Sequence, residues 1–151
     1  MSKKIAITVR LNIAHRSNNF KSAHVVIIDN GKILIVKRSL SDMWMPGHYA
    51  LPGGKIENSE TVERAIAREC LEETNLIIDQ RSLVCLSEIS TAKNHGFYYT
   101  TQYCGNIKLD HEHDDFKWVD PKDLTTLKVV PDMIMVVSTA LNHLKCIKYK
   151  H

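Results

Sequence analysis

Carboxylates recur at helical spacing in the segment Gly54–Leu76, and these are the residues of the chain best suited to chemistry. At about 100° per residue, Glu69, Glu72 and Glu73 fall within an arc of about 100° on one helix face. Three like charges on one face repel one another unless a cation lies among them. Because carboxylate oxygens are hard ligands, Mg2+ or Mn2+ is the expected cation. The spacing therefore predicts a metal-binding helix face, with a solvated acidic face as the alternative.

The neighbouring residues predict that this helix runs from Thr61 to Thr74. Thr61 is a suitable N-cap residue, and Asn75 is expected to end the helix in the left-handed conformation. The opposite side is expected to be an apolar stripe formed by Ile66, Ala67, Cys70 and Leu71. Such a helix packs one side against the protein while its acidic side faces a ligand.

Gly53 and Gly54 precede the acidic helix and predict a glycine turn. A residue without Cβ lets backbone groups approach a ligand where any side chain would intrude. A glycine-rich turn that leads into a carboxylate-bearing helix suits a phosphate bridged by a metal ion.

The segment resembles the signature box of the Nudix hydrolases, Gly-x5-Glu-x7-Arg-Glu-bulky aliphatic-x-Glu-Glu-x-Gly-bulky aliphatic. All charged positions match. Cys70 departs from the pattern as a small hydrophobe in place of a bulky aliphatic residue, and Asn75 replaces a glycine but tolerates the same left-handed conformation. The matching positions are Gly54, Glu60, Arg68, Glu69, Cys70, Glu72, Glu73, Asn75 and Leu76.

The resemblance implies hydrolysis of a nucleoside diphosphate linked to another moiety, by water attack at phosphorus with Mg2+, or Mn2+ in its place. Glu69, Glu72 and Glu73 would be the metal ligands, joined by the Gly54 carbonyl. Glu69 and Glu72 are also expected to be catalytic, and Glu69 could act as the general base instead of a ligand.

Four further residues are assigned roles, three of them from the same resemblance and Arg38 from its place in the loop before the box. Arg68 and Glu60 are expected to be structural, with Arg68 orienting a neighbouring carboxylate by a charge-assisted hydrogen bond. Arg38 is expected to bind substrate together with Gly53 and Gly54, against the alternative of a surface cation. Glu112 resembles the loop acid that some family members use as base or additional ligand. The alternatives in the same loop are Asp114 and Asp115.

Length and composition favour one globular domain over residues 1–151, with 44% hydrophobic residues and a net charge of +3. Outside the box, 17 Lys and Arg face 11 Asp and Glu, so an acidic site lies within a basic remainder. This balance suits a small anionic nucleotide substrate. Without a basic run or nucleic-acid motif, polymeric nucleic acid is not an expected partner. A homodimer remains open.

The cysteines and the termini predict a cytoplasmic protein. Four cysteines without CxxC pairing suggest reduced thiols rather than a disulfide framework or a zinc site. No apolar run approaches 18 residues and no signal peptide is recognisable, so no membrane contact is expected.

The remaining chain predicts strands and one further helix. Asn30-Gly31 separates two β-rich runs, residues 23–29 and 32–37, and is a strong hairpin signal. Further strands are expected over residues 4–13, 48–51, 82–91, 97–109 and 116–119, loops over 38–47 and 110–115, a short helix or turn at 121–124, and a closing helix over 131–146. This order predicts an α+β fold, and the resemblance implies an α/β/α sandwich with a mixed sheet flanked by the box helix and the C-terminal helix.

Three functions fit these residues. The first is a pyrophosphohydrolase, acting either on a (d)NTP in nucleotide-pool sanitation or on a substrate of the ADP-ribose, dinucleotide or nucleotide-sugar type. The second is a non-catalytic Nudix module that binds a nucleotide or partner, which the complete set of box acids disfavours. The third is an acidic-helix domain without a metal.

Overall fold

The structure is a computed structural model that describes residues 19–91 and 93–148. The expected strand over residues 4–13 lies outside this range. A mixed sheet occupies the centre, with β3, β2, β1, β7 and β6 in that order. In addition, β4 pairs with β1 and β9 pairs with β2. The strands are β1 (Ser22–Asp29), β2 (Lys32–Arg38), β3 (Tyr49–Ala50), β4 (Gly53–Lys55), β6 (Val84–Cys85), β7 (His95–Thr100) and β9 (His113–Val119).

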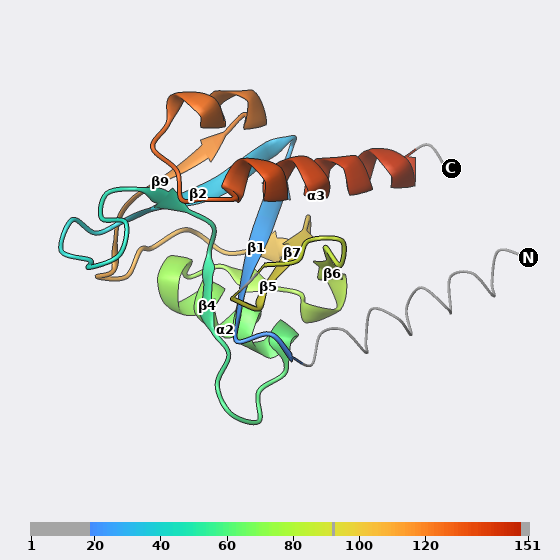
Figure 1. Cartoon of the computed structure of the whole chain (residues 1–151), viewed down its shortest axis with the longest axis horizontal. Coiled ribbons are helices and arrows are strands. Elements are labelled where there is room, and N and C mark those ends of the chain that lie inside the picture. The colour runs from blue at the N-terminus through green and yellow to red at the C-terminus, as the bar shows by residue number, and fades with distance from the viewer. Residues whose placement is uncertain (1–18, 92, 149–151) are drawn as a thin grey trace, which may run out of the picture.

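The two helices cover opposite faces of this sheet (Figure 1). Helix α2 (Val62–Thr74) packs through Val62, Ile66 and Cys70 against the face that carries Val25 and Ile27 of β1. Helix α3 (Met133–Lys148) packs against the other face, which carries Val26 and Ile28. Side chains of a strand alternate between the two faces of the sheet, and a helix covers each face of β1. Both sets of β1 side chains are therefore buried, and its sequence is a continuous apolar run. The α+β fold with its α/β/α layers is confirmed.

The β1–β2 hairpin forms where the sequence predicts it. Asn30 and Gly31 both have positive φ angles, 50° and 77°, as a two-residue turn of this kind requires. The register pairs Asp29 with Lys32. By contrast, β1 pairs with β7 in parallel, with His24 opposite Phe97, so the sheet is mixed.

Helix α2 begins and ends at the predicted residues. Thr61 Oγ1 accepts a hydrogen bond from the Arg64 N–H, and Asn75 is left-handed with φ 65°. The predicted apolar stripe is partly wrong, because Leu71 is exposed. The buried side of the helix instead includes Ala65 and Glu73.

The predicted strand boundaries after α2 are mostly wrong. A 3₁₀ turn, η2 (Gln80–Ser82), precedes a two-residue β6, so residues 82–91 do not form one strand. Strand β7 stops at Thr100, whose hydroxyl accepts a hydrogen bond from the Gln102 N–H. A separate ribbon follows, in which β8 (Tyr103–Cys104) pairs with β5 (Ile77–Ile78). Residues 105–109 are not a strand, because Gly105 turns the chain with φ 105°.

Three other boundaries differ from expectation. The glycine pair is not a turn but the strand β4, which pairs antiparallel with β1. Strand β9 begins at His113, inside the expected loop, and pairs with β2. The final helix starts at Met133 because Asp132 has a φ of 70°, which a right-handed helix excludes. The short helix η3 (Pro121–Thr126) is confirmed. Among the described residues, no helix is long and apolar enough to cross a membrane.

Candidate active site

A pocket of about 830 Å3 opens between the acidic side of α2, the loop after β2 and the start of α3. Its volume is that of a typical small-molecule site. The cationic side chains of Arg38, Lys55 and Lys93 line it, together with the acids Glu69 and Glu73 of α2. Opposite charges on one pocket wall suit a ligand in which anionic groups are bridged by a cation.

Gly54 gives Glu69 its place in the pocket. A Cβ on Gly54 would lie 2.7 Å from the carboxyl carbon of Glu69, so the carboxylate lies directly against the glycine backbone. The pairing of β4 with β1 fixes the Gly54 backbone, and the Glu69 carboxylate comes from the neighbouring helix α2. The close approach requires glycine at this position.

Glu73 is the most buried acid of the site, with 5% of its surface exposed. Burial, and to a smaller extent the neighbouring Glu69 carboxylate, raises the pKa of Glu73 to about 9. The Gly53 N–H donates a hydrogen bond of 3.3 Å to Glu73 Oε2, which partly offsets the burial. In the absence of a cation, Glu73 is therefore protonated at neutral pH.

Arg68 holds the acids of the segment in place. Its Nε and Nη2 donate to both oxygens of Glu60, at 2.8 and 3.0 Å, in a bidentate pair. Its Nη1 donates to Glu69 at 2.9 Å, and Nη2 also reaches the Lys55 carbonyl at 3.0 Å. These bonds lower the pKa of Glu60 and connect the β4 backbone to α2. The arrangement supports the structural role expected for Arg68 and Glu60.

Glu72 stands apart from the other two acids of the helix face. Its side chain is 56% exposed and accepts a hydrogen bond of 3.4 Å from Arg68 Nη1. Over residues 19–91 and 93–148, no three acidic, histidine or cysteine side chains stand close enough together to hold one ion. Glu72 must therefore turn away from Arg68 before it can join Glu69 and Glu73.

The chemistry of the donor set fits a hard divalent cation. Burial and the neighbouring Glu69 carboxylate both disfavour a charged Glu73, so the two acids are both charged only when a cation lies between them. Carboxylate oxygens with a backbone carbonyl such as that of Gly54 are the ligands that Mg2+ and Mn2+ take.

The loop after β2 forms a second wall of the pocket. Arg38 is 22% exposed there, and its guanidinium is bound by Asp42 at 2.5 Å and by the Trp44 carbonyl at 2.9 Å. The guanidinium carbon also lies 4.9 Å from the centre of the Trp44 ring. Arg38 is thus a positioned cation in the pocket wall rather than a free surface charge.

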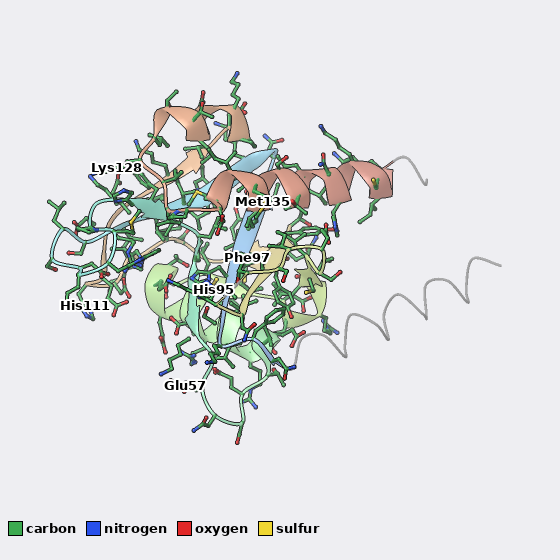
Figure 2. The ribbon with its side chains drawn as sticks, in the orientation of Figure 1. Glu57, His95, Phe97, His111, Lys128 and Met135 are labelled. Atoms are coloured by element: carbon green, nitrogen blue, oxygen red, sulfur yellow. The ribbon has the colours of Figure 1, made fainter. Side chains whose placement is uncertain are left out.

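The loop before β9 contributes Glu112 to the lining of the pocket. Glu112 is exposed and lines the pocket, whereas Asp114 accepts a hydrogen bond from the Leu40 N–H and Asp115 one from the Tyr49 hydroxyl. His113 is half-buried, with 7% of its side chain accessible, and its Nδ1 lies 2.8 Å from Asp110 Oδ1. His111 is exposed at the pocket rim on the loop labelled in Figure 2.

Sequence reasoning did not find the far wall of the pocket. His24 of β1 and His95 and Phe97 of β7 line it. The period-2 pattern places His24 on the same face of β1 as Val26 and Ile28, which was a signal that this face changes from apolar to polar. The parallel pairing of β1 with β7, which brings the three rings together, has no local sequence signature.

Comparisons with known proteins agree with this geometry. A family model described as NUDIX domain matches residues 19–138. A Caenorhabditis elegans nudix hydrolase is 26% identical over 85% of this chain and 37% of its own length. The ADP-ribose pyrophosphatase of Methanocaldococcus jannaschii is 46% identical over 39% of this chain and 34% of its own length. The nucleoside triphosphatase NudI of Escherichia coli is 28% identical over 66% of this chain and 80% of its own length. The chain thus spans little more than a third of the first two relatives.

Solved structures share the fold. The NUDIX domain of Shewanella oneidensis NrtR, complexed with ADP ribose, has a TM-score of 0.67 at 20% identity, over 83% of this chain and 88% of its own. A bifunctional NMN adenylyltransferase/ADP ribose pyrophosphatase from Francisella tularensis, complexed with AMP and a Mn ion, has a TM-score of 0.60 at 22% identity, over 94% of this chain and 47% of its own. With its family match over residues 19–138 and its complete set of charged box residues, the chain belongs to the Nudix hydrolase family.

Proposed function

We propose that the protein is a pyrophosphohydrolase that uses Mg2+, or Mn2+ in its place, to cleave the diphosphate of a nucleoside diphosphate linked to a second group. The observation that carries this proposal is the Glu69–Glu73 acid pair, which lies against the Gly54 backbone inside a pocket with Arg38, Lys55 and Lys93. A diphosphate repels an attacking oxygen, so the reaction needs positive charge on the phosphate oxygens. A bound divalent ion supplies that charge and activates water.

Different residues would bind the cation, position its ligands, bind the phosphates and act as the general base. Glu69, Glu72 and Glu73, with the Gly54 carbonyl, would hold the cation. Arg68, bound to Glu60, positions the Glu69 carboxylate. Arg38 and the Gly53–Gly54 backbone would bind the phosphates. Glu112 is the proposed general base, with Glu69 as its alternative.

Glu112→Gln tests the assignment of the base. If Glu112 takes the proton of the attacking water, the variant lowers kcat by about 100-fold with little change in metal affinity, since general-base catalysis contributes about that much. Initial rates and Mn2+ titration of the same preparation measure both quantities. Asp114→Asn, at the start of β9, is the control and should leave kcat unchanged. An unaltered kcat in Glu112→Gln returns the role to Glu69.

Two alanine substitutions separate the backbone role of the glycine pair from its site role. A Cβ on Gly53 would lie 2.2 Å from the Ala23 carbonyl oxygen at a φ of 147°, so Gly53→Ala should lower the free energy of unfolding by about 3 kcal/mol or more. In Gly54→Ala the new methyl group meets the end of the Glu69 side chain instead of backbone atoms. This variant should keep its stability within about 1 kcal/mol while losing at least about tenfold in kcat. Urea unfolding measures the stability of both variants, and initial rates measure their kcat. Equal losses of stability in the two variants would contradict a backbone role for Gly53 and a site role for Gly54.

A substrate of the ADP-ribose type is the first candidate. The pocket continues beyond the acids to Thr91, Lys93 and Phe97, which leaves room for groups on both sides of a diphosphate. The relative from Methanocaldococcus jannaschii is named an ADP-ribose pyrophosphatase, and it is 46% identical over the 59 residues that it shares with this chain. A nucleoside triphosphate is the second candidate, because the NudI match covers most of that enzyme.

Product analysis of the purified protein with Mg2+ tests the proposal. The panel holds (d)NTPs, ADP-ribose, diadenosine polyphosphates and nucleotide sugars. Release of AMP from ADP-ribose or a dinucleotide supports the first candidate, and release of pyrophosphate from a triphosphate supports the second. A folded protein that binds nucleotides but cleaves none of them would contradict the enzyme and favour a binding module.

A further inference from the structure

Asp110 lies between two parts of the site, the last turn of α2 and the loop that carries Glu112. The Asp110 N–H donates a hydrogen bond of 3.2 Å to the Glu73 carbonyl, and the Lys108 N–H donates one of 2.9 Å to the Thr74 carbonyl. The last carbonyls of a helix have no partner within the helix, so this segment supplies donors to the end of α2. The chain before Glu112 is thereby attached to the helix that carries the acid pair.

The Asp110 side chain orders the backbone of Glu112. Its Oδ1 accepts a hydrogen bond of 3.2 Å from the Glu112 N–H and lies 2.8 Å from His113 Nδ1. A carboxylate oxygen only accepts, so both nitrogens donate to it. An aspartate that bonds the N–H two residues later fixes a turn of the backbone. The Asp110 side chain is 18% exposed, so water competes little for these bonds.

The loop after β2 contacts the same segment from its other side. The Ser39 N–H donates a hydrogen bond of 2.9 Å to the Glu112 carbonyl. The next residue, Leu40, donates its N–H to Asp114 Oδ2 at 3.2 Å. Both backbone groups of Glu112 are therefore hydrogen-bonded, whereas its side chain is exposed and lines the pocket.

The pairing of β9 with β2 is irregular directly after Glu112. Lys37 pairs with Asp115 and Arg38 with His113, so β9 contains one more residue than β2 at this point. Such a β-bulge re-aims neighbouring side chains and occurs often beside active sites. The direction of Glu112 thus depends on a local irregularity, and Asp110 bonds this segment at its beginning.

We infer that Asp110 is a positioning residue, which sets the place of the Glu112 carboxylate relative to the acid pair of α2. Its N–H is attached to the backbone of Glu73, and its carboxylate orders the backbone of Glu112. The inference rests on the proposed function for the role of Glu112 as the base. It adds a residue outside the box whose hydrogen bonds determine whether the base reaches the attacking water.

Two variants of Asp110 in the full chain test the inference. Asp110→Asn keeps an oxygen that accepts from both N–H groups, and Asp110→Ala removes it. Both variants remove the same negative charge, so the difference between them reports the hydrogen bonds. The alanine variant should have a kcat at least about tenfold below that of the asparagine variant, because a displaced base no longer reaches the water. Their KM and Mn2+ affinity should agree within about twofold.

Initial rates with the nucleotide that the product panel shows to be cleaved, and Mn2+ titration of the same preparations, give these quantities. Asp120→Ala is the matched control, because Asp120 also accepts a hydrogen bond from the N–H two residues later, at 3.1 Å, but does not line the pocket. Its kcat should equal that of the unmodified protein. Equal kcat values of Asp110→Ala and Asp110→Asn would overturn the inference.

A double-mutant cycle shows whether Asp110 acts through Glu112. In the background of Glu112→Gln, the change Asp110→Ala should cause no further loss of kcat, because the group that it positions is already gone. A tenfold loss in both backgrounds would mean that Asp110 acts on another group and would overturn the inference.

Hydrogen exchange of the Glu112 amide tests the positioning without any turnover. In the unmodified protein this amide should exchange at least about tenfold more slowly than in the unfolded chain, because it is hydrogen-bonded to Asp110. Asp110→Asn should keep this protection and Asp110→Ala should lose it. An unprotected amide in the unmodified protein would overturn the inference without the use of any variant.

The outcome is separable from that of the proposed function. A folded protein that cleaves no nucleotide refutes the enzyme, and amide exchange still decides whether Asp110 orders Glu112. Hydrolysis that Glu112→Gln slows and Asp110→Ala leaves unchanged refutes the positioning role alone. Hydrolysis that Glu112→Gln leaves unchanged also refutes it, while the enzyme stands with Glu69 as the base.

Discussion

Glu73→Gln is expected to lower kcat by two to three orders of magnitude, roughly the cost of removing one preorganised charged partner from an active site. The amide has the shape of the carboxyl but cannot become an anionic ligand. Because Glu73 is protonated in the metal-free protein, a neutral amide should fit the folded state without loss of stability. Initial rates at saturating Mg2+ and urea unfolding of the same preparation measure the two effects.

Glu63→Gln provides the matched control, because Glu63 lies in the first turn of the same helix and does not line the pocket. Its kcat should equal that of the unmodified protein. Glu72→Gln should resemble Glu73→Gln if Glu72 leaves Arg68 to join the cation. Near-normal turnover in both Glu72→Gln and Glu73→Gln would refute the assignment of the metal ligands.

Stability of the metal-free protein is expected to fall as the pH rises from about 4.5 to about 9. The pKa of Glu73 is raised from 4.5 to about 9 by folding, chiefly because the carboxyl is buried. Within this window the folded protein keeps a proton that the unfolded chain has released, so the free energy of unfolding decreases with pH. The contribution is complete below about 4.5 and is lost as the pH passes through the raised pKa.

A cation should reverse this trend, because its binding requires the deprotonated acid. Urea unfolding at pH 5.5, 7 and 8.5 should show a free energy of unfolding that decreases with pH in EDTA. The increase in this free energy on addition of Mg2+ should become larger over the same pH values. Metal affinity should rise by up to about tenfold per pH unit in the same range. Glu73→Gln should remove both dependences. Identical pH profiles of the variant and the unmodified protein in EDTA would contradict the protonation state assigned to Glu73.

Local signals accounted for the parts of the fold that the sequence predicted correctly. The turn at Asn30-Gly31 is determined by its own backbone angles, and α2 is bounded by Thr61 and Asn75. The charged box residues are close in sequence, so helical spacing alone brings Glu69 and Glu73 together. These features need no information from distant parts of the chain.

The wrong predictions concern segments whose structure depends on contacts between residues far apart in sequence. Thr100 ends β7 by bonding Gln102, and Gly105 turns the chain before residues that bond the end of α2, as the Lys108 N–H does with the Thr74 carbonyl. The burial of Glu73 could not be seen in a helical wheel, because β4 lies against that side of α2. The contact of the His24 ring with those of His95 and Phe97 depends on a parallel strand pair whose members are far apart in sequence.

The most direct test of the central claim is the time course of ADP-ribose hydrolysis by the purified protein with Mg2+, before and after addition of EDTA. Cleavage at the diphosphate should release AMP and ribose 5-phosphate in equal amounts, and EDTA should stop the reaction. Added Mg2+ in excess should restore the rate. Intact ADP-ribose after incubation with folded protein would contradict this substrate, and a rate that EDTA leaves unchanged would contradict the metal site on α2.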